Sequence, residues 1–294
     1  MDIAEIKNKK TIKELLEFGI INIDKPSGPT SFSVSEFVCK ELKARKTSHF
    51  GTLDPKVTGV LPVALNRACK LTGYFLGEDK EYVGVMRLHQ ELDLEIIKKS
   101  IQDKFIGKIT QMPPVKSRVK RQDREREIYS FDLLEKKDKD ILFKVKCEGG
   151  TYIRKLIDDL GKEIGVGAHM LELRRISAGI FKEEDKEYPC VKMYDFEKAV
   201  YEYENGNDEL LRKIIIPAEV VAEVYPALEI REDNLKQILT GKPLHKRDLL
   251  DDEGWKVDSI VSCFCNGSFI GMYKIFRGKE IFAKAEFVMQ EIRG

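Results

Sequence analysis

The residues best suited to chemistry surround Asp54, in the segment GTLDPKVTGVL that spans residues 51–61. Asp54 directly precedes Pro55 and lies between Gly51 and Gly59, so the proline restrains its backbone and the glycines permit a tight turn. A carboxylate held rigidly and left accessible in this way suits a nucleophile or a general base. The same pattern also fits a plain turn in which Asp54 only accepts hydrogen bonds from nearby backbone amides.

Histidine and cysteine residues form no pattern typical of a metal site. His89, His169 and His245 are far apart in the sequence, and no CxxC pair occurs beside another such pair or a histidine cluster. Structural zinc and a disulfide framework are therefore not expected. Cys263 and Cys265 alternate along an apolar segment, which favours packing in a core.

The elements that must position Asp54 can be predicted from periodicity and from turn residues. Residues 19–24 form an apolar run that predicts a buried strand, and the turn cluster at 25–29 ends it. A helix should follow from Thr30 or Ser31, which are suitable caps. Asp54 then lies in a loop at 47–59 that leads into an apolar strand at 60–65, a helix that ends at residue 76 and a strand at 81–88.

The rest of the first 225 residues mixes the two kinds of element without a regular strand–helix–strand repeat. We expect helices at 93–105, 152–164, 193–203 and 208–215, a hairpin of strands at 129–134 and 141–147, and a strand at 170–176. This arrangement is typical of an α+β fold rather than of a doubly wound parallel sheet.

The pattern changes between residues 217 and 226. Beyond it a short capped helix at 232–239 is followed by β-rich segments at 259–265, 269–276 and 281–289, with glycines at the turns. We therefore predict a division into residues 1–225 and a small β domain of residues 226–294.

Composition excludes several classes of protein. The 51 Lys and Arg residues balance 50 Asp and Glu residues, which gives a formal net charge of +1. Coating of nucleic acid by bulk charge is therefore excluded, although a local basic stripe could hold a phosphate backbone. No run approaches the ~20 apolar residues of a membrane span, and residues 1–10 lack the apolar centre of a signal peptide. We expect a cytoplasmic protein with no membrane partner.

Five motifs, found in the same order along the chain, resemble those of the TruB family of pseudouridine synthases, and within it the archaeal and eukaryotic dyskerin-type enzymes of H/ACA ribonucleoprotein particles. The resemblance covers nearly the whole chain. The matching segments are Lys25-Pro26-Ser27-Gly28 with Thr30-Ser31, the Asp54 segment with His49, Lys80-Glu81-Tyr82, Gly150-Thr151-Tyr152-Ile153-Arg154, and Gly167-Ala168-His169-Met170 through Leu173-Arg174-Arg175.

The resemblance implies a role for each matching residue. Asp54 falls on the catalytic aspartate, Arg154 on the arginine that pairs with it, and Tyr82 on the tyrosine that stacks on the target base. His49 falls on a histidine used when the uridine leaves its stack, and Leu173 on a leucine that closes the base pocket. Lys25 and Pro26 belong to the motif that supports the catalytic loop, and we count them with the substrate-binding residues.

The physical chemistry of the implied reaction agrees with these residue types. Conversion of uridine to pseudouridine breaks the bond from N1 to the ribose and rejoins the uracil through C5, which requires no cofactor and no metal. Asp54 could attack the base or the ribose, or remove a sugar proton. Arg154 would favour the anion in a closed pocket. Taken singly, Arg154 also fits a surface cation, and Tyr82 and Leu173 fit core residues.

A basic segment follows Pro114. Between residues 116 and 126 there are six cations and two acids, and five of the cations occupy even positions, so on an extended strand they would share one face. These five are Lys116, Arg118, Lys120, Arg124 and Arg126. Because the family binds RNA we favour an RNA-contacting row, extended by Lys155, Arg174 and Arg175, over a solvated edge that discourages aggregation.

Two departures from the family pattern bear on function. Phe50 stands where many relatives have a small residue, so the entrance to the pocket could be narrower or the loop differently packed. The segment after Pro114 is too short for the tRNA-gripping insertion of the bacterial enzymes, which favours the RNA-guided branch. The partners implied are an H/ACA guide RNA, rRNA and tRNA substrates, and small protein subunits that include a kink-turn-binding ribosomal-type protein.

Residues 226–294 resemble a PUA domain, a small β barrel that holds the ACA end of the guide RNA in dyskerin-type proteins. Two alternatives to the RNA-guided enzyme remain open. One is a guide-free synthase that acts on the tRNA T-loop, and the other is a non-catalytic RNA-binding scaffold. The joint presence of Asp54, Tyr82 and Arg154 argues against the scaffold.

Overall fold

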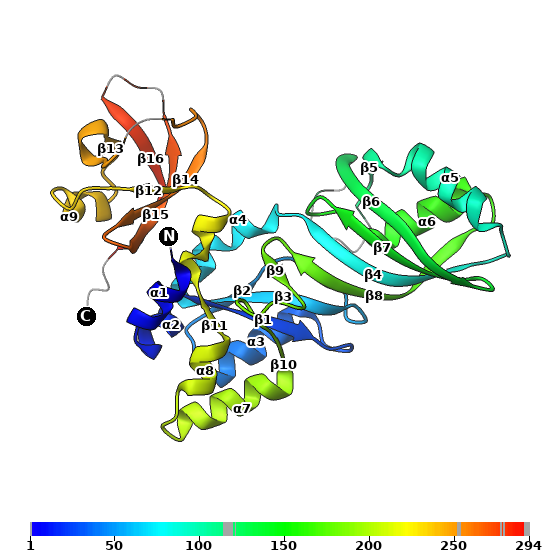
Figure 1. Ribbon diagram of the computed structural model, residues 1–294, viewed down its shortest axis with the longest axis horizontal. Helices are drawn as coiled ribbons and strands as arrows, with labels where there is room; N and C mark the ends of the chain where they lie inside the picture. Colours follow the sequence, from blue (N-terminus) through cyan, green and yellow to red (C-terminus); the bar gives the residue numbers. More distant parts are fainter. Residues whose placement is uncertain are drawn as a thin grey trace. The chain divides into compact units, whose positions relative to one another are not determined.

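The computed structural model describes residues 2–113, 120, 122–251, 254–276, 278 and 280–290. Contacts divide the chain into two compact units, Gly19–Ile215 on the one hand and Met1–Phe18 with Ile216–Gly294 on the other. The domain division at residue 225 stays a prediction. Both units mix strands and helices in the order drawn in Figure 1, and the expectation of an α+β fold is confirmed.

A mixed sheet forms the centre of the first unit, with the strand order β10-β1-β3-β8-β4-β7-β6-β5. The β1–β10 and β3–β8 pairs are parallel, and the other neighbours in this order are antiparallel. In addition β2 pairs with β3, and β9 pairs with β8. The strands are β1 Gly19–Lys25, β2 Thr47–His49, β3 Thr58–Leu65, β4 Lys80–Leu88, β5 Gly107–Gln111, β6 Arg124–Lys137, β7 Asp140–Cys147, β8 Ala168–Ala178, β9 Phe181–Lys182 and β10 Cys190–Lys192.

Helices of this unit begin where capping residues allow it. Thr30 caps α3 by accepting a hydrogen bond from the Ser33 amide, and Asp93 caps α5 by accepting one from the Glu95 amide. Helices α5 and α6 lie together on one side of the strands β4, β6 and β7 (Figure 1). The helices are α3 Ser31–Glu41, η1 Asn66–Leu71, α4 Thr72–Leu76, α5 Leu94–Lys104, α6 Ile153–Glu163, α7 Met193–Glu204 and α8 Glu209–Ile214.

Burial follows the periodicity of each element. Strands β1 and β3 are buried along nearly their whole length, whereas β4 and β7 alternate, as strands do when one face is covered. Helix α6 buries Leu156, Ile157 and Leu160 at helical spacing and packs against β8. These buried surfaces fix the ends of β3, β4 and α6, which carry the predicted site residues.

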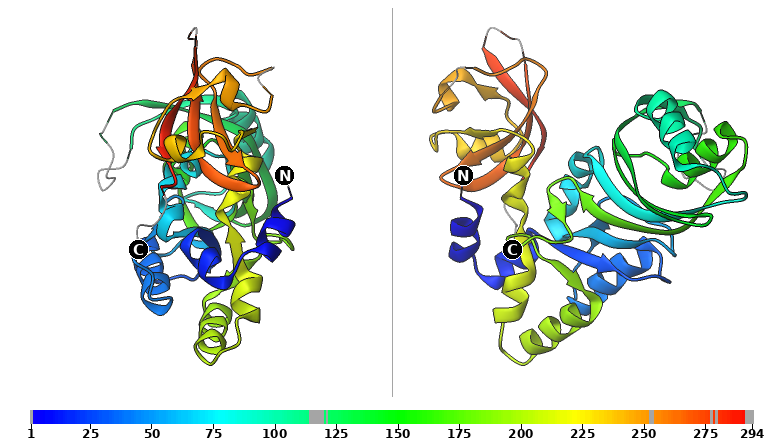
Figure 2. Two further views of the ribbon diagram at one scale, coloured as in Figure 1. Left: turned by 90° about the vertical axis from the view of Figure 1, so that its left-hand side faces the viewer. Right: turned by 45° about the vertical axis from the view of Figure 1, so that its right-hand side comes forward.

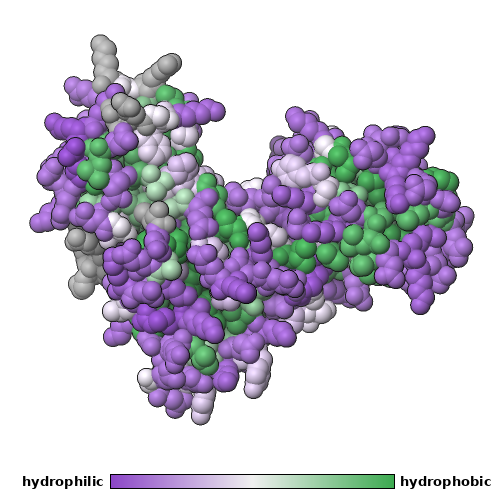
Figure 3. All heavy atoms as spheres, in the orientation of Figure 1, coloured by the Kyte–Doolittle hydropathy of each residue, from purple (hydrophilic) through white to green (hydrophobic). Residues whose placement is uncertain are grey.

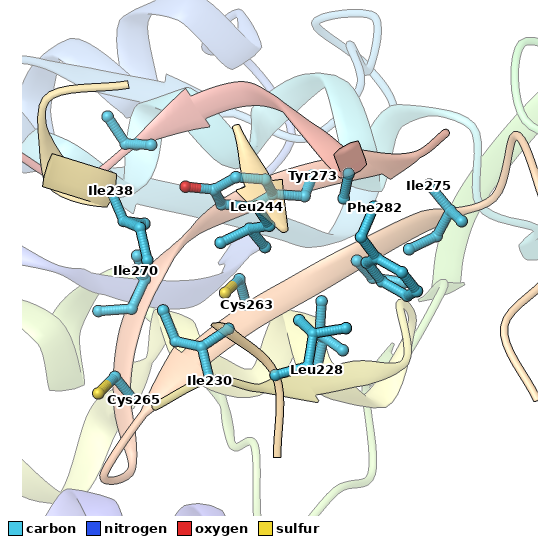
Figure 4. Packing of buried hydrophobic residues seen from close by; sticks show 14 residues of the cluster. Leu228, Ile230, Ile238, Leu244, Cys263, Cys265, Ile270, Tyr273, Ile275 and Phe282 are labelled. Atoms are coloured by element: carbon cyan, nitrogen blue, oxygen red, sulfur yellow. The ribbon is translucent and has the colours of Figure 1, made fainter. Parts of the chain in front are cut away.

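The second unit contains a curled sheet with the strand order β12-β14-β15-β16-β13 (Figure 2). Its core includes Cys263, Cys265 and Tyr273 (Figure 4), so the prediction that the two cysteines are core residues is confirmed. The predicted helix at 232–239 is shorter than expected. The elements are α1 Ile3–Lys9, α2 Ile12–Glu17, β11 Ile215–Pro217, η2 Ala218–Glu223, β12 Ala227–Glu229, α9 Leu235–Leu239, β13 Leu244–His245, η3 Lys246–Asp248, β14 Ile260–Cys265, β15 Ser268–Ile275 and β16 Ile281–Val288.

Apolar side chains remain exposed on the first unit. Leu134 on β6 is 54% exposed and Leu171 on β8 is 38% exposed. Figure 3 shows that apolar residues gather over the strands on the right-hand side of that view. Among the described residues, no helix combines the length and the apolar character needed to cross a membrane.

Candidate active site

Asp54 lies in the loop between β2 and β3, and its carboxylate pairs with Arg154. Asp54 Oδ2 is 3.1 Å from Arg154 Nη2. A turn holds the aspartate, because the Val57 amide donates to the Asp54 carbonyl at 3.0 Å. The predicted partnership of these two residues, which are 100 positions apart, is thus present in the geometry, and the guanidinium stabilises the ionised carboxylate.

Arg154 is the second residue of α6, and its helix start is held by Gln111 at the end of β5. The Gln111 side chain accepts from the Tyr152 amide at 3.0 Å and donates to the Tyr152 carbonyl at 3.3 Å. Gln111 is only 2% exposed. Two hydrogen bonds from one buried amide fix the backbone just before Arg154.

Ser31 fixes the backbone just before Asp54 in the same manner. Its hydroxyl accepts from the Leu53 amide at 2.8 Å and donates to the Leu53 carbonyl at 3.0 Å. Both Ser31 and Leu53 are buried. The first turn of α3 therefore fixes the backbone position of the residue that precedes Asp54.

Lys25, the last residue of β1, supports the loop that carries Asp54. Its ammonium donates to the carbonyls of Val57 at 2.7 Å, Pro26 at 2.9 Å and Pro55 at 3.0 Å. Burial lowers the pKa of Lys25, and the charge of Asp54 opposes this change. The side chain is fully buried, so this geometry offers a support for the loop rather than a direct contact with RNA. Pro26 itself is exposed.

Tyr82 and Leu173 share one face of the sheet. The β4–β8 register pairs Tyr82 with Arg175 and Gly84 with Leu173, two residues further along each strand. A Cβ built on Gly84 would lie 2.9 Å from Leu173 Cδ1, so the leucine packs directly over the glycine. Tyr82 and Leu173 are each 8% exposed. Burial raises the pKa of Tyr82, and the charge of Arg175 opposes part of that rise.

His49 and Phe50 precede the Asp54 loop and are both tied to the sheet. His49 is half-buried at the end of β2, where it pairs with Val63. Phe50 is 1% exposed and stacks on Phe75 with ring centroids 4.7 Å apart. The Phe50 ring is therefore packed in the core, and the two expectations for this position stay predictions.

The Asp54–Arg154 pair is open to solvent. The Arg154 side chain is 61% exposed and that of Asp54 is 54% exposed. The expectation of a closed pocket around the pair is therefore not met by the chain alone. A cavity of about 660 Å³ in this unit lies elsewhere, lined by residues such as Glu78 and Glu184.

The predicted basic row is only partly within the described chain. Lys116 and Arg118 lie outside the described residues, and Lys120 is exposed. Arg124, Arg126 and the buried Ile128 occupy every second position of β6 and therefore lie on the same face. The two arginines are half-buried on this covered face and do not project from a solvated edge. Contact of the row with RNA stays a prediction.

Arg126 lies close to the start of α6. It pairs with Glu148 at 3.5 Å, and one of its guanidinium nitrogens lies 3.1 Å from the Cβ position of Gly150. This placement brings a half-buried cation within a few residues of Arg154.

The proposed extension of the row is wrong for the residues tested. Lys155 is paired with Asp159 on its own helix. Arg174 donates in a fork to Asp24 at 2.9 and 3.0 Å and also bonds Glu183, and these bonds raise its pKa. Arg175 is buried in the sheet.

The histidines also depart from expectation, because His89 and His169 are paired. Their ring nitrogens Nε2 and Nδ1 are 3.1 Å apart, and the β4–β8 sheet brings the two residues together. Within the described residues no group of three or more His, Cys, Asp or Glu side chains could hold a metal ion.

Sequence reasoning missed the buried residues that hold the site. Gln111 and Arg175 were given no positioning role, whereas Ser31 was considered as a cap and as part of the motif that supports the catalytic loop. Arg175 directly follows Arg174, so no apolar pattern in the sequence marks it as buried.

Two family models cover consecutive parts of the chain. Residues 40–153 match the model described as "TruB family pseudouridylate synthase (N terminal domain)", and residues 154–223 match that described as "tRNA pseudouridylate synthase B C-terminal domain". The first contains Asp54 and Tyr82, and the second begins at Arg154.

Individual proteins resemble the chain over most of its length. A protein of Methanothermobacter thermautotrophicus named "Probable tRNA pseudouridine synthase B" is 40% identical over 268 residues, which are 90% of this chain and 81% of that protein. The crystal structure of a Cbf5-Nop10-Gar1 complex contains a chain that matches with a TM-score of 0.87 and 36% identity, over 97% of this chain and 89% of that one. An H/ACA RNP bound to a substrate RNA containing 2'-deoxyuridine matches with a TM-score of 0.85 and 34% identity, over 97% and 89%.

The fold, the aspartate–arginine pair and these matches define a pseudouridine synthase, an isomerase that acts on RNA. The chain belongs to the TruB family. Within that family it is similar to archaeal relatives and to the Cbf5 protein, the archaeal dyskerin.

Proposed function

We propose that the protein is the catalytic subunit of an H/ACA particle, in which a guide RNA selects the uridine and Asp54 performs the chemistry. The pairing of Asp54 with Arg154 at 3.1 Å, on a chain similar to Cbf5, carries this proposal. The substrates are rRNA and tRNA in the cytoplasm. The matched Cbf5 chain forms a complex with Nop10 and Gar1, and the exposed apolar residues Leu134 and Leu171 support small protein partners of this kind here.

Tyr82, Leu173 and His49 each have a separate role in binding the target uridine. A uridine leaves its stack at a cost of a few kcal/mol, and stacking on Tyr82 returns on the order of 1–3 kcal/mol. Leu173 lies on the same face of the sheet and closes the base pocket. His49 assists the uridine as it leaves the helix.

The chemical step is an isomerisation. The N1–C1′ bond breaks, the uracil turns while both fragments are held, and a C5–C1′ bond forms. The proton lost from C5 balances the one gained at N1, and the Tyr82 phenol is suited to transfer it. Asp54 acts on the base or on the ribose, and Arg154 holds its carboxylate through the ion pair.

The test uses RNA with tritium at C5 of uridine, because formation of the C5–C1′ bond releases that label to water. Protein with its particle partners is incubated with substrate, with and without a matching H/ACA guide RNA. We expect release that depends on the guide. The Asp54→Asn variant should release none while its affinity for RNA changes little, and Asp103→Asn, an exposed aspartate on α5, serves as the matched control. Release by Asp54→Asn would refute the assignment of the catalytic residue.

A guide-free tRNA synthase is the second candidate, because the archaeal relative carries the name of a tRNA enzyme. Strong single-turnover release from unmodified tRNA without any guide RNA would favour it. Retention of RNA binding together with no release from any substrate would instead indicate a scaffold.

A further inference from the structure

Arg175 is a fully buried cation to which the reaction described above gives no task. We propose that Arg175 is a positioning residue that joins Tyr82 to the loop carrying Asp54, so that the stacked base and the carboxylate keep a fixed relation. The inference rests on the proposed function and adds to it a residue that acts through two others.

The strand register places Arg175 between the two groups. Arg175 on β8 pairs with Tyr82 of β4 on one side and with Gly59, where the Asp54 loop enters β3, on the other. Gly59 has φ +100°, and a Cβ there would lie 2.2 Å from the Arg175 carbonyl oxygen. The backbones of β3 and β8 therefore approach each other so closely at this point that only glycine fits at position 59.

The Arg175 guanidinium forms hydrogen bonds with both ends of the loop that carries Asp54. Its Nε donates to the carbonyl of Val60 at 2.8 Å, where the loop ends, and Nη2 donates to the carbonyl of Phe50 at 3.3 Å, where the loop begins. Nη1 lies 3.1 Å from the Cβ position of Gly51. The charge of Arg175 also acts on the Tyr82 phenol, where it lowers the pKa against the effect of burial. One planar side chain thus bonds to both ends of the loop and lies beside the tyrosine of the neighbouring strand.

Among the described residues, no carboxylate forms an ion pair with this buried charge. Arg175 is 1% exposed, and the titratable side chains close enough to influence its charge are Tyr82 and Lys80, neither of which is an anion at neutral pH. Cys147, which lies near Tyr82, has a pKa raised to about 12 and is a neutral thiol. The carbonyls of Val60 and Phe50 are therefore the groups that balance the charge, and burial of a cation against neutral groups is costly.

The position of Arg175 beside Tyr82 has a chemical consequence. A guanidinium has donors and no acceptor, so in a hydrogen bond between the two side chains Arg175 donates and the phenol oxygen accepts. The phenol proton is then free to point elsewhere, and a base stacked on Tyr82 is the reactant nearest to it in the proposed reaction. Arg175 thereby orients the group that is suited to transfer the proton between C5 and N1.

The experiment introduces a fluorinated tyrosine at position 82, whose phenol ionises nearer neutrality and can be followed by fluorine NMR. Its titration, the single-turnover rate at saturating RNA and the affinity for RNA are measured for the unsubstituted chain, Arg175→Gln and Arg175→Lys. The control is Arg87→Gln, an exposed arginine on β4 that forms a fork with Asp140 at 2.6 Å.

We expect Arg175→Gln to move the phenol titration to higher pH and to lower the rate on the order of 100-fold, with RNA affinity nearly unchanged. Arg175→Lys retains the charge and loses the fork, so the rate should fall while the titration stays near that of the unsubstituted chain. Arg87→Gln should change none of the three quantities.

Three results would overturn the proposal. The first is a wild-type rate and titration in Arg175→Gln or Arg175→Lys. The second is an equal loss of rate in Arg87→Gln. The third concerns the unsubstituted chain and applies even if neither Arg175 variant folds: a crystal structure in which the guanidinium contacts neither the Val60 nor the Phe50 carbonyl. If the unsubstituted chain forms no pseudouridine, the proposed function fails, and the titration still tests the link between Arg175 and Tyr82.

Discussion

Replacing Lys25 with methionine tests whether a buried ammonium holds the catalytic loop. Methionine has a similar volume but cannot donate, so the variant loses three hydrogen bonds, of 2.7, 2.9 and 3.0 Å, to the carbonyls of Val57, Pro26 and Pro55. Each bond to a charged donor contributes roughly 1.5–3 kcal/mol, and relief of the desolvated ammonium returns part of the sum. We expect a loss of about 2–4 kcal/mol in the free energy of unfolding.

The effect on catalysis should exceed the effect on binding. Loss of the support lets Asp54 move relative to the base, and a misplacement of this kind costs on the order of 100-fold in rate. Tritium release under single-turnover conditions measures the rate, and urea unfolding measures stability. Lys99→Met, an exposed lysine on α5, is the matched control. A wild-type rate with weakened RNA affinity would refute this reasoning and would return Lys25 to the substrate-binding role that its motif suggests.

Three further predictions concern other buried polar groups. Gln111→Leu removes the two hydrogen bonds between the Gln111 side chain and the Tyr152 backbone, so the free energy of unfolding should fall by about 2 kcal/mol and the single-turnover rate should fall with it; an unchanged melting temperature would contradict this. Lys80 has a pKa lowered to about 8 by burial, so between pH 8 and 10 the unfolded chain holds a proton that the folded chain lacks. Stability relative to Lys80→Met should therefore rise with pH in this window, by up to about 3 kcal/mol in urea titrations, whereas a constant difference would exclude it. The Tyr273 hydroxyl is buried without a partner among the described residues, so Tyr273→Phe should keep or raise the melting temperature of the unit shown in Figure 4, and a lower one would count against the assignment.

Most of the fold could be predicted from periodicity. The hairpin of β6 and β7, the helices α5 and α6 and the strands β14, β15 and β16 fall within about five residues of the expected bounds, because each has a clear period and a turn at its ends, whereas the short strands β12 and β13 were not predicted. The meeting of Asp54 with Arg154 has a different origin. No local pattern relates residues so far apart. Only the resemblance of the ordered motifs to those of the TruB family predicted that Asp54 and Arg154 meet.

The resemblance assigned Lys25 to a motif that supports the catalytic loop, but the burial of the supporting cations could not be predicted, because residue type alone places a cation at the surface. Lys25 and Arg175 are buried against backbone carbonyls, and carbonyls carry no sequence signal. The pairing of His89 with His169 likewise depends on the register of β4 and β8, which sequence separation does not reveal. Strand periodicity predicted a shared face for Arg124 and Arg126, but it does not tell which face of the strand is covered.

The openness of the Asp54–Arg154 pair bears on what can serve as a substrate. With both side chains more than half exposed, bulk water competes for the carboxylate, and a nucleoside alone is too small to displace it. The bound RNA must then cover the Asp54–Arg154 pair and exclude water from it, so that a closed active site exists only in the complex with the substrate. Free uridine should consequently remain unaltered at concentrations at which a short oligonucleotide reacts.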